Sequence, residues 1–491
     1  MEALPSVGVP AEQVLAEITQ LRTVDLPTHG GRLFAYVYDP AVAGLDDLTA
    51  SAHALAAHVN ALNPTAFPSL LAMENALVGA AARLLGGGPG AVDSVVGNVT
   101  SGGTESLILA VKAARDARPE IAEPELVMPI SAHAALGKAA SYLGVRLRTV
   151  PLDPVSLRPS VADLVAAITP ATVLVACSAP SYAHGLIDPV EAIAEAAAAR
   201  GVRCHVDACF GGWTLPYLRR LGAPVPPFDF AVPGVTSVSV DLHKYAYCPK
   251  GVSILLHRDP SLRAPQYFAY ADWPGYTMVN ATVASTRSGG PTAAAFATLR
   301  HLGDEGYLRL AGQTVEAVRD LSASVAAVPG LRLLSEPTLS TVVAFTSDDP
   351  GLDLFVLADE LTVRGWHTQP QLAHGNVPRS IHLTVTASVR PQTDEFAAAL
   401  AEAALAARVI EPVRLPDELV AMASGLTPAD LTDEVVAGLA GALGVGGSDS
   451  DPGPLPERQA VINTLIELAP PPARAAMFTA FLSLLQRPEY G

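Results

Sequence analysis

The sequence predicts an α/β protein with a large, mostly parallel sheet and helices on both of its faces. From about residue 61 to 310, short apolar runs alternate with helical patterns; the strand candidates are 126–130, 172–177, 203–207, 237–241 and 252–256. Such alternation is typical of parallel sheets, because each strand returns through a helix before the next one begins. The composition agrees, since 50% of the 491 residues are hydrophobic and only 5% are aromatic, which suits helices packed on a buried sheet.

The remaining patterns divide the rest of the chain. A smaller α/β domain is predicted from strand patterns at 331–334, 341–345 and 380–386. The extended piece 31–38 is expected to be an arm that clasps a partner chain. A Gly/Ser/Asp/Pro-rich stretch, 444–456, is expected to be a flexible linker in a helical tail that packs on a dimer or covers the site entrance. The expected organisation is 1–60, a dimer-contacting arm; 61–310, the large domain; 311–414, the small domain; and 415–491, a helical extension.

The charge and the cysteines exclude several classes of protein. A formal net charge of −17 argues against binding of nucleic acid and against attraction to anionic membranes. The four cysteines lack zinc-like spacing, and a disulfide framework is unusual in a protein this large, so we expect no metal and a cytoplasmic location. The first residues lack the basic and apolar regions of a signal peptide, and prolines interrupt the longest uncharged stretch, 169–187. No transmembrane anchor is therefore expected.

A lysine follows one of the predicted strands directly. Lys244 lies in the segment Ser-Val-Asp-Leu-His-Lys-Tyr, 239–245, after an apolar run. A primary amine beside a histidine and small residues is what a Schiff base with pyridoxal 5′-phosphate (PLP) requires, with a pKa lowered so that the free amine can exchange onto substrate. A lysine at the end of a strand is more often simply solvated, so this interpretation depends on three other segments.

The first of these segments is a glycine pair that opens a helical pattern. Gly102 and Gly103 are flanked by Ser101 and Thr104. Free backbone N–H groups and the positive end of a helix favour an anion, and glycines let the backbone approach a phosphate closely. The spacing fits neither ATP-binding nor dinucleotide-binding loops, so a different phosphate ligand is indicated. The alternative is a capped helix after a turn.

The other two segments supply a carboxylate and an imidazole. Asp207 ends a buried strand pattern, and a buried carboxylate needs a cationic partner such as a protonated pyridine nitrogen. His133 opens a helix at the carboxyl end of another strand, where open α/β sheets bind ligands, and its ring could stack on a flat cofactor. The alternative for each residue is a helix cap.

Taken together, these motifs resemble the sphingosine-1-phosphate lyases, in the group II decarboxylase branch of the fold-type-I PLP-dependent enzymes. The resemblance extends in the family's order from about residue 30 to 310. The segments that carry it are 100–106 (Thr-Ser-Gly-Gly-Thr-Glu-Ser), 131–140, 178–189, 205–212 (His-Val-Asp-Ala-Cys-Phe-Gly-Gly), 235–239, 241–245 (Asp-Leu-His-Lys-Tyr), 272–273, 286–290 (Thr-Arg-Ser-Gly-Gly) and 303–307. It implies the fold-type-I architecture with PLP as the cofactor.

The resemblance also implies a role for individual residues. Lys244 would form the Schiff base, His133 would stack on the pyridine ring and Asp207 would pair with its nitrogen. Tyr38 and Lys250 would face the substrate, with Tyr38 coming from the partner chain, so that the active sites are shared in a homodimer. The expected phosphate-binding residues are Gly102, Gly103, Thr104 and His243, with Ser288, Gly289 and Gly290 from the neighbouring subunit.

Two positions depart from the lyase pattern. Asn63 stands where the lyases have a histidine that helps to bind the substrate phosphate, and Met278 stands where they have a tyrosine. Tyr276 could reach the same space from a shifted register. All three are candidate substrate-binding residues. A neutral asparagine holds a dianionic phosphate less well than an imidazolium does, so a non-phosphorylated substrate stays open.

These residues predict an enzyme that breaks a bond to Cα of a small amine substrate. The favoured reaction is cleavage of the Cα–Cβ bond of a β-hydroxy amine with release of an aldehyde, as in sphingolipid-like metabolism. The alternative is an amino-acid decarboxylase, and a third hypothesis is a PLP-binding scaffold without turnover. The expected catalytic residues are Lys244, His133, Asp207, Lys250 and Tyr38.

Overall fold

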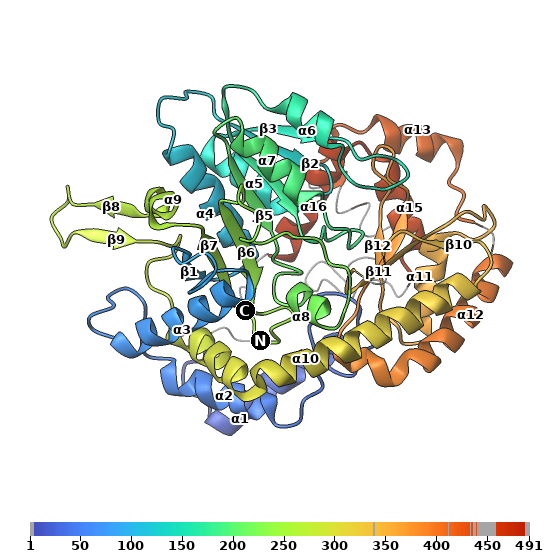
Figure 1. The fold of residues 1–491 in the computed structure, drawn as a ribbon. Coiled ribbons are helices and arrows are strands. Elements are labelled where there is room, and N and C mark those ends of the chain that lie inside the picture. The colour runs from blue at the N-terminus through green and yellow to red at the C-terminus, as the bar shows by residue number, and fades with distance from the viewer. Residues whose placement is uncertain are drawn as a thin grey trace.

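The computed structural model describes residues 4–336, 339–410, 412–432, 434–435, 438 and 458–486. Its larger sheet has seven strands in the order β1-β7-β6-β5-β4-β2-β3 (Figure 1). The strands are β1 Val96–Thr100, β2 Glu125–Pro129, β3 Arg146–Val150, β4 Thr172–Ser178, β5 Arg203–Asp207, β6 Ser237–Asp241 and β7 Ser253–His257. Strands β3, β2, β4, β5 and β6 are parallel, whereas β7 is antiparallel to both β6 and β1. The predicted mostly parallel sheet is confirmed.

The five predicted strands of this sheet are present within one residue at each end. Strands β1 and β3 were not predicted. β3 is an edge strand whose side chains are largely exposed, so it lacks a continuous apolar run. β1 contains a glycine and an asparagine, which are uncommon in strands.

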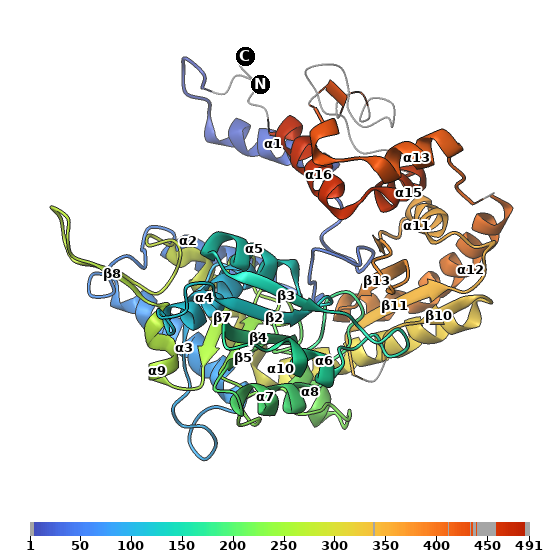
Figure 2. The ribbon, with the colours of Figure 1, turned by 90° about the horizontal axis from the view of Figure 1, so that it is seen from above.

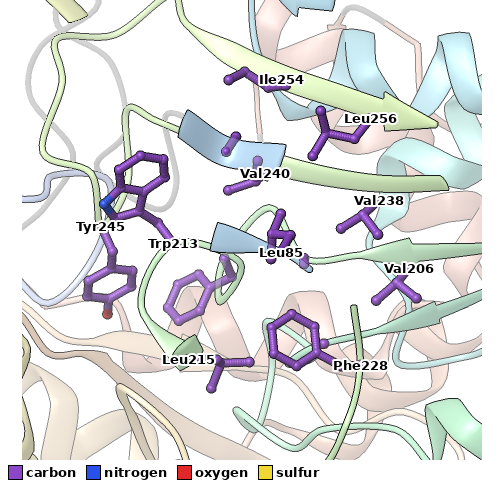
Figure 3. Close-up of a cluster of buried hydrophobic side chains, with 14 of the residues drawn as sticks. Leu85, Val206, Trp213, Leu215, Phe228, Val238, Val240, Tyr245, Ile254 and Leu256 are labelled. Atoms are coloured by element: carbon purple, nitrogen blue, oxygen red, sulfur yellow. The ribbon is translucent and has the colours of Figure 1, made fainter. Parts of the chain in front are cut away.

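Helices cover both faces of the larger sheet. In Figure 2, α4 and α5 lie on one face, and α6, α7 and α8 lie on the other. Between sheet and helices is a core that includes Val206, Val238 and Phe228 (Figure 3), each at most 1% exposed. Each such side chain contributes about 1.5–3 kcal/mol of hydrophobic free energy. The helices of this part are α2 Leu45–Ala56, α3 Pro68–Leu84, α4 Gly103–Asp116, α5 Ala134–Leu143, α6 Val161–Ala167, α7 Val190–Ala198, α8 Leu215–Arg220 and α9 Pro260–Arg263.

A second, antiparallel sheet follows in the chain, with the strand order β10-β11-β13-β12. Its strands and helices are β10 Leu331–Leu333, β11 Val342–Ser347, α11 Leu354–Val363, β12 Gln369–Gln371, β13 Ser380–Thr384 and α12 Thr393–Val409. The long helix α10, Gly289–Ala327, runs from α2 and α3 to this sheet and is kinked at Gly303 (Figure 1). The expected boundary at 310 lies inside α10, and the division into domains stays a prediction.

The extended piece 31–38 packs on its own chain, and the dimer-clasping role that we expected for it stays a prediction. The Phe34 backbone bonds to this chain's second sheet, donating to the carbonyl of His367 (2.9 Å) and accepting from the amide of Thr384 (2.8 Å). The Phe34 ring is fully buried against Trp366 and Phe396. Because the segment can satisfy both its backbone and its apolar side chain within one chain, it packs as an added strand-like piece. The helix α1, Ala11–Leu21, precedes it and has no buried residue.

The described part of the C-terminal tail packs on the second sheet's helix α11. It comprises α13 Asp417–Gly425, α15 Ala460–Leu468 and α16 Pro471–Leu485. Both carboxylate oxygens of Asp359 accept backbone N–H groups at the start of α15 (2.8 and 2.9 Å), and Glu467 at its end pairs with Arg379. The predicted linker 444–456 lies outside the described residues.

A short hairpin projects from the body of the molecule, formed by β8 Phe268–Tyr270 and β9 Met278–Asn280 (Figures 1 and 2). The 3₁₀ turns are Arg22–Val24, Ala264–Gln266, Ala387–Gln392 and Pro428–Asp430. Within the described ranges, no helix has the length and apolar character needed to cross a membrane.

Candidate active site

Seven of the predicted site residues line one cavity at the carboxyl ends of the parallel strands. Ser178, Asp207 and Asp241 are the last residues of β4, β5 and β6, and His133 follows β2. The cavity has a volume of about 430 Å³, within the range of small-molecule sites. Its lining residues are Ser101, Gly102, Gly103, Thr104, Glu105, Leu107, His133, Ser178, Pro180, Tyr182, Asp207, Cys209, Phe210, Asp241, His243 and Lys244.

Lys244 is held at the cavity by a buried carboxylate. Its Nζ atom is 2.9 Å from Oδ2 of Asp241, which is only 2% exposed and also faces His243 (3.5 Å). Burial alone would lower the pKa of Lys244, but the attraction of Asp241 outweighs it and raises that pKa. We expected a lowered pKa. That expectation is wrong for this structure, because a carboxylate three residues before the lysine stabilises the ammonium form.

The glycine pair forms the start of helix α4, as predicted. The first backbone N–H groups of a helix have no partner within it, so this end favours an anion. A Cβ atom on Gly103 would lie 2.8 Å from both Oδ2 of Asp241 and Sγ of Cys209. Only glycine therefore lets the helix start approach the base of the cavity this closely. Glu105 fixes the turn by accepting the backbone N–H of Ser101 (2.6 Å).

The carboxylate and the imidazole also lie where the sequence predicted them. Asp207 is 7% exposed, and its Oδ1 accepts the backbone N–H of Cys209 (3.1 Å) and the hydroxyl of Ser239 (3.4 Å). No described lysine, arginine or histidine lies within ion-pair distance of it. His133 caps α5, with Nδ1 accepting the backbone N–H of Ala135 (3.2 Å). Its ring remains at the cavity wall, so the capping and ligand-binding interpretations are compatible.

Tyr38 lies beside the cavity of its own chain, and its expected contribution from a partner chain stays a prediction. Its ring packs edge-on against Tyr245 (5.2 Å between centroids) and Phe210 (6.2 Å). Tyr38 lies there because segment 31–38 pairs with the second sheet, which places Tyr38 near the carboxyl ends of the strands. Nζ of Lys250 lies 4.9 Å from the centre of the Tyr38 ring. Burial and the nearby charge of Lys244 lower the pKa of Lys250 to about 8.

The three candidate substrate residues outside this cluster do not line the cavity of their own chain. Asn63 is exposed, and its Oδ1 accepts the backbone N–H (2.9 Å) and the hydroxyl (2.7 Å) of Thr65 within a local turn. Tyr276 and Met278 belong to the projecting hairpin, where Tyr276 is 56% exposed. The sequence could not show this, because the hairpin is continuous in the chain with the cavity segments but points away from them.

The predicted phosphate residues on α10 likewise do not line this cavity. Ser288 caps α10, and a Cβ atom on Gly289 or Gly290 would lie 2.6 Å from Val59 or 2.5 Å from His53. Within one chain these glycines allow α10 to pack closely on α2 and on the residues that directly follow α2. Their role toward a neighbouring subunit stays a prediction.

Several residues at the cavity were not among the predicted site residues, and Asp241, Cys209, Tyr182 and Phe210 are four of them. Asp241 could have been found from its position three residues before Lys244. Cys209 follows Asp207 by two residues and, being buried beside carboxylates, has a raised thiol pKa. Tyr182 and Phe210 carry no signal in a single sequence, because aromatic residues near a strand end are usually part of the core.

The residues present fit PLP. A helix start with an obligatory glycine suits the phosphate, an amine lies beside it, and the buried, unpaired carboxylate of Asp207 suits a protonated ring nitrogen. No described cluster of histidine, cysteine or carboxylate side chains could hold a metal ion.

Comparison with known proteins agrees with this geometry. The pyridoxal-dependent decarboxylase conserved domain matches residues 5–347, about two thirds of the chain. The chain belongs to this family. It is therefore a PLP-dependent enzyme, and the resemblance that the motifs indicated is confirmed. The C-terminal HTH domain of pyridoxal-dependent enzymes matches residues 417–484.

Several relatives are sphingosine-1-phosphate lyases. The rice (Oryza sativa subsp. japonica) lyase is 37% identical over 80% of this chain and 72% of its own length. The Arabidopsis thaliana lyase is 40% identical over 71% of this chain, which spans 63% of that protein. Among solved structures, the Burkholderia pseudomallei sphingosine-1-phosphate lyase superposes with a TM-score of 0.78 at 35% identity, covering 83% of this chain and 94% of that one. A Lactobacillus brevis glutamate decarboxylase, 19% identical with a TM-score of 0.73, shows the shared fold alone.

Proposed function

We propose that this decarboxylase family member is an aldehyde-lyase that cleaves the Cα–Cβ bond of a β-hydroxy amine, with sphingosine 1-phosphate as the first substrate to test. The observation that carries the proposal is the cavity itself. It joins an amine, a buried carboxylate, an imidazole and a helix start, and Lys250 adjoins it, in a chain 35–40% identical to several proteins named as such lyases.

The side chains divide the work in this proposal. PLP, when bound, serves as the electron sink for the bond that breaks at Cα. Lys244 would hold the cofactor, Asp207 would keep its ring nitrogen protonated, and the start of α4 would bind its phosphate. Because its pKa is about 8, Lys250 populates both protonation states near neutral pH. It can therefore hold or release a proton beside Tyr38, as general acid–base catalysis requires.

We further propose that the enzyme is a homodimer with shared sites. The projecting hairpin exposes Phe268 (48%), Tyr270 (48%) and Trp273 (42%), and exposed aromatic clusters are typical of protein–protein contacts. A partner copy would cover these rings and receive Tyr276 and Met278 near its own cavity. Molar mass by light scattering tests this, since Tyr270→Ser with Trp273→Ser should shift the protein towards monomer. A monomeric wild-type protein would contradict it.

The four described cysteines are buried and unpaired, which supports the expected cytoplasmic location.

Amino-acid decarboxylation is the second candidate function. A Methanothermobacter thermautotrophicus protein named "Probable L-tyrosine/L-aspartate decarboxylase" is 34% identical over 66% of this chain and 87% of its own length. The same constellation would serve if the substrate presented its carboxylate for cleavage.

Product analysis separates these functions. β-Hydroxy amines, with and without a phosphate, and a set of amino acids are incubated with the holoenzyme. Aldehyde release supports the lyase, and stoichiometric CO₂ overturns it in favour of the decarboxylase. Cofactor absorbance without any product favours the scaffold. Lys244→Ala should abolish both absorbance and product, whereas the control Lys138→Ala, on α5 and outside the cavity, should retain both.

A further inference from the structure

One loop joins the cavity to the second sheet. It runs over residues 178–188 and is closed at its base, where the Asp188 amide donates to the Ser178 carbonyl (3.0 Å) and Asp188 Oδ2 accepts the Ser178 amide (2.7 Å). Near its middle, Gly185 has a φ of +68°, and a Cβ atom there would lie 2.2 Å from the Ser340 hydroxyl. The loop is therefore fixed both to β4 and to the second sheet.

The tip of this loop is bound by two strands of the second sheet. The carbonyl oxygen of Ala183 accepts from Nε2 of Gln371 on β12 (2.8 Å) and lies 3.2 Å from Nδ1 of His382 on β13. Two donors to one carbonyl satisfy both of its lone pairs. The neighbouring Tyr182 is thereby held in one place although it lies on a loop.

The hydrogen bonds of His382 define its tautomer. The ring is fully buried, which lowers its pKa to about 4, so it is neutral. A carbonyl can only accept, so Nδ1 carries the proton and donates to Ala183. The other nitrogen, Nε2, must then accept, and its partner at 2.8 Å is the hydroxyl of Thr384. The Thr384 oxygen therefore donates to His382 and keeps lone pairs for another donor.

Tyr182 is the group that this arrangement presents to the cavity. Its ring stacks on His382 (4.4 Å between centroids, 24° between planes) and meets Phe210 edge-on at 6.0 Å. Tyr182 lines the cavity together with Lys244. Burial raises the pKa of Tyr182 and keeps its hydroxyl protonated, and a protonated phenol oxygen still has lone pairs with which to accept a hydrogen bond.

We infer that Tyr182 accepts a hydrogen bond from the substrate's β-hydroxyl group and that His382 is its positioning residue. This inference rests on the proposed lyase function, because only that reaction needs an oriented β-hydroxyl. When Cα–Cβ breaks, the proton of that hydroxyl passes to Lys250, the acid–base residue of the proposed function in its neutral form, while Tyr182 fixes the conformation from which cleavage occurs. It also gives the second sheet a direct part in substrate recognition.

The test compares two probes in the Tyr182→Phe holoenzyme. One probe is a 2-amino-1,3-diol carrying a 1-phosphate, and the other is its analogue lacking the 3-hydroxyl. Phenylalanine keeps the stack on His382 and removes only the acceptor. Loss of one neutral hydrogen bond should raise KM for the diol about threefold to tenfold. The dissociation constant of the deoxy analogue, measured by calorimetry, should stay within about twofold, since it has no hydroxyl to lose.

Two further variants complete the experiment. Tyr142→Phe, on an exposed tyrosine of α5, should leave both probes unaffected. His382→Phe preserves an aromatic stack but removes both hydrogen bonds, so it should reproduce the selective effect, and the double variant with Tyr182→Phe should add little to either. Melting temperature and cofactor absorbance report whether each variant is folded and loaded.

The outcomes separate this inference from the proposed function. Equal weakening of both probes, or of neither, by Tyr182→Phe would overturn the role of Tyr182. A wild-type enzyme that releases no aldehyde from any β-hydroxy amine would overturn the lyase function. Calorimetry would then still compare the two probes, because neither would be consumed.

Discussion

Asp241 sets the charge of Lys244, and the substitution Asp241→Asn tests this directly. Asparagine has nearly the shape of aspartate and can still accept the hydroxyl of Ser253, but it removes the negative charge 2.9 Å from Nζ. Burial would then act on Lys244 with Asp207 as the remaining carboxylate that opposes it. We therefore expect the amine to change from a group with a raised pKa to one whose pKa lies below its ordinary value of 10.5.

The size of the effect follows from the distance between the charges. At 2.9 Å and an effective dielectric constant of about 20, the attraction is about 6 kcal/mol, equivalent to about 4 pKa units. Lys244 retains 20% side-chain exposure, so solvent reduces this and we expect a fall of at least about 2 units. The raised pKa of Lys244 means that the pair stabilises the fold fully below pH 10.5 and loses this at higher pH. The lowered pKa of Asp241 means that the contribution is also lost as the pH falls below about 3.8.

The assay is the rate at which the apoprotein takes up PLP, followed by absorbance from pH 6 to pH 10. Uptake requires the free amine, so the rising limb of the rate profile should move at least about 2 pH units towards acid in Asp241→Asn. Ser253→Ala is the matched control, since it removes one hydrogen bond to Asp241 but keeps the charge, and its profile should move little. An Asp241→Asn profile that coincides with that of the wild type would refute the assigned role. Thermal unfolding of the apoproteins near neutral pH should show a less stable Asp241→Asn variant.

Three other substitutions test the packing and electrostatics around the site. Gly103→Ala would place Cβ 2.8 Å from Asp241, so we expect about 1–3 kcal/mol less stability and weaker PLP binding, whereas Gly137→Ala, with a nearest neighbour at 4.0 Å inside helix α5, should lower neither in melting and titration experiments. Burial raises the pKa of Asp188 to about 7, so the free energy of unfolding of the wild type should fall as the pH rises from about 4 to about 7. Asp188→Asn should remove up to about 4 kcal/mol of that fall. Urea unfolding at both pH values measures it, and an equal fall in the variant and the wild type would contradict this. Asp359→Ala should cost about 0.5–2 kcal/mol by uncapping α15, seen as a lower melting temperature with unchanged cofactor absorbance.

The strands that carry the site were predictable because burial leaves a direct mark on sequence. β5 and β6 are short, largely buried strands that end in Asp207 and Asp241, and a residue at the end of a parallel strand must lie at the ligand-binding edge. The glycine pair and His133 were predictable for a related reason, since both open helices directly after strands. Contacts across long separations were not predictable. Tyr38 reaches the cavity only because Phe34 packs in the second sheet, and no local pattern encodes that pairing.

The contact between Tyr182 and His382 at the cavity was also not predictable from the sequence. Tyr182 and His382 are 200 residues apart, and each alone is an ordinary buried side chain. They come together because the second sheet fixes the loop tip through the Ala183 carbonyl. A site assembled only from the first sheet would explain how the cofactor is held but not how one substrate is preferred over another.

The position of Asn63 affects how the enzyme could bind a phosphate group on its substrate. Its side-chain oxygen is occupied by Thr65, so it could offer an anion only its neutral NH₂ group. A phosphate on the substrate would then depend mainly on a cation, and Lys250 is the lysine that adjoins the cavity beside Tyr38. Because its pKa is about 8, that cation weakens as the pH rises through this value. Binding of a phosphorylated substrate should therefore weaken above pH 8 while binding of its unphosphorylated counterpart does not. Measuring both affinities across that range decides whether Lys250 compensates for the histidine that this chain lacks.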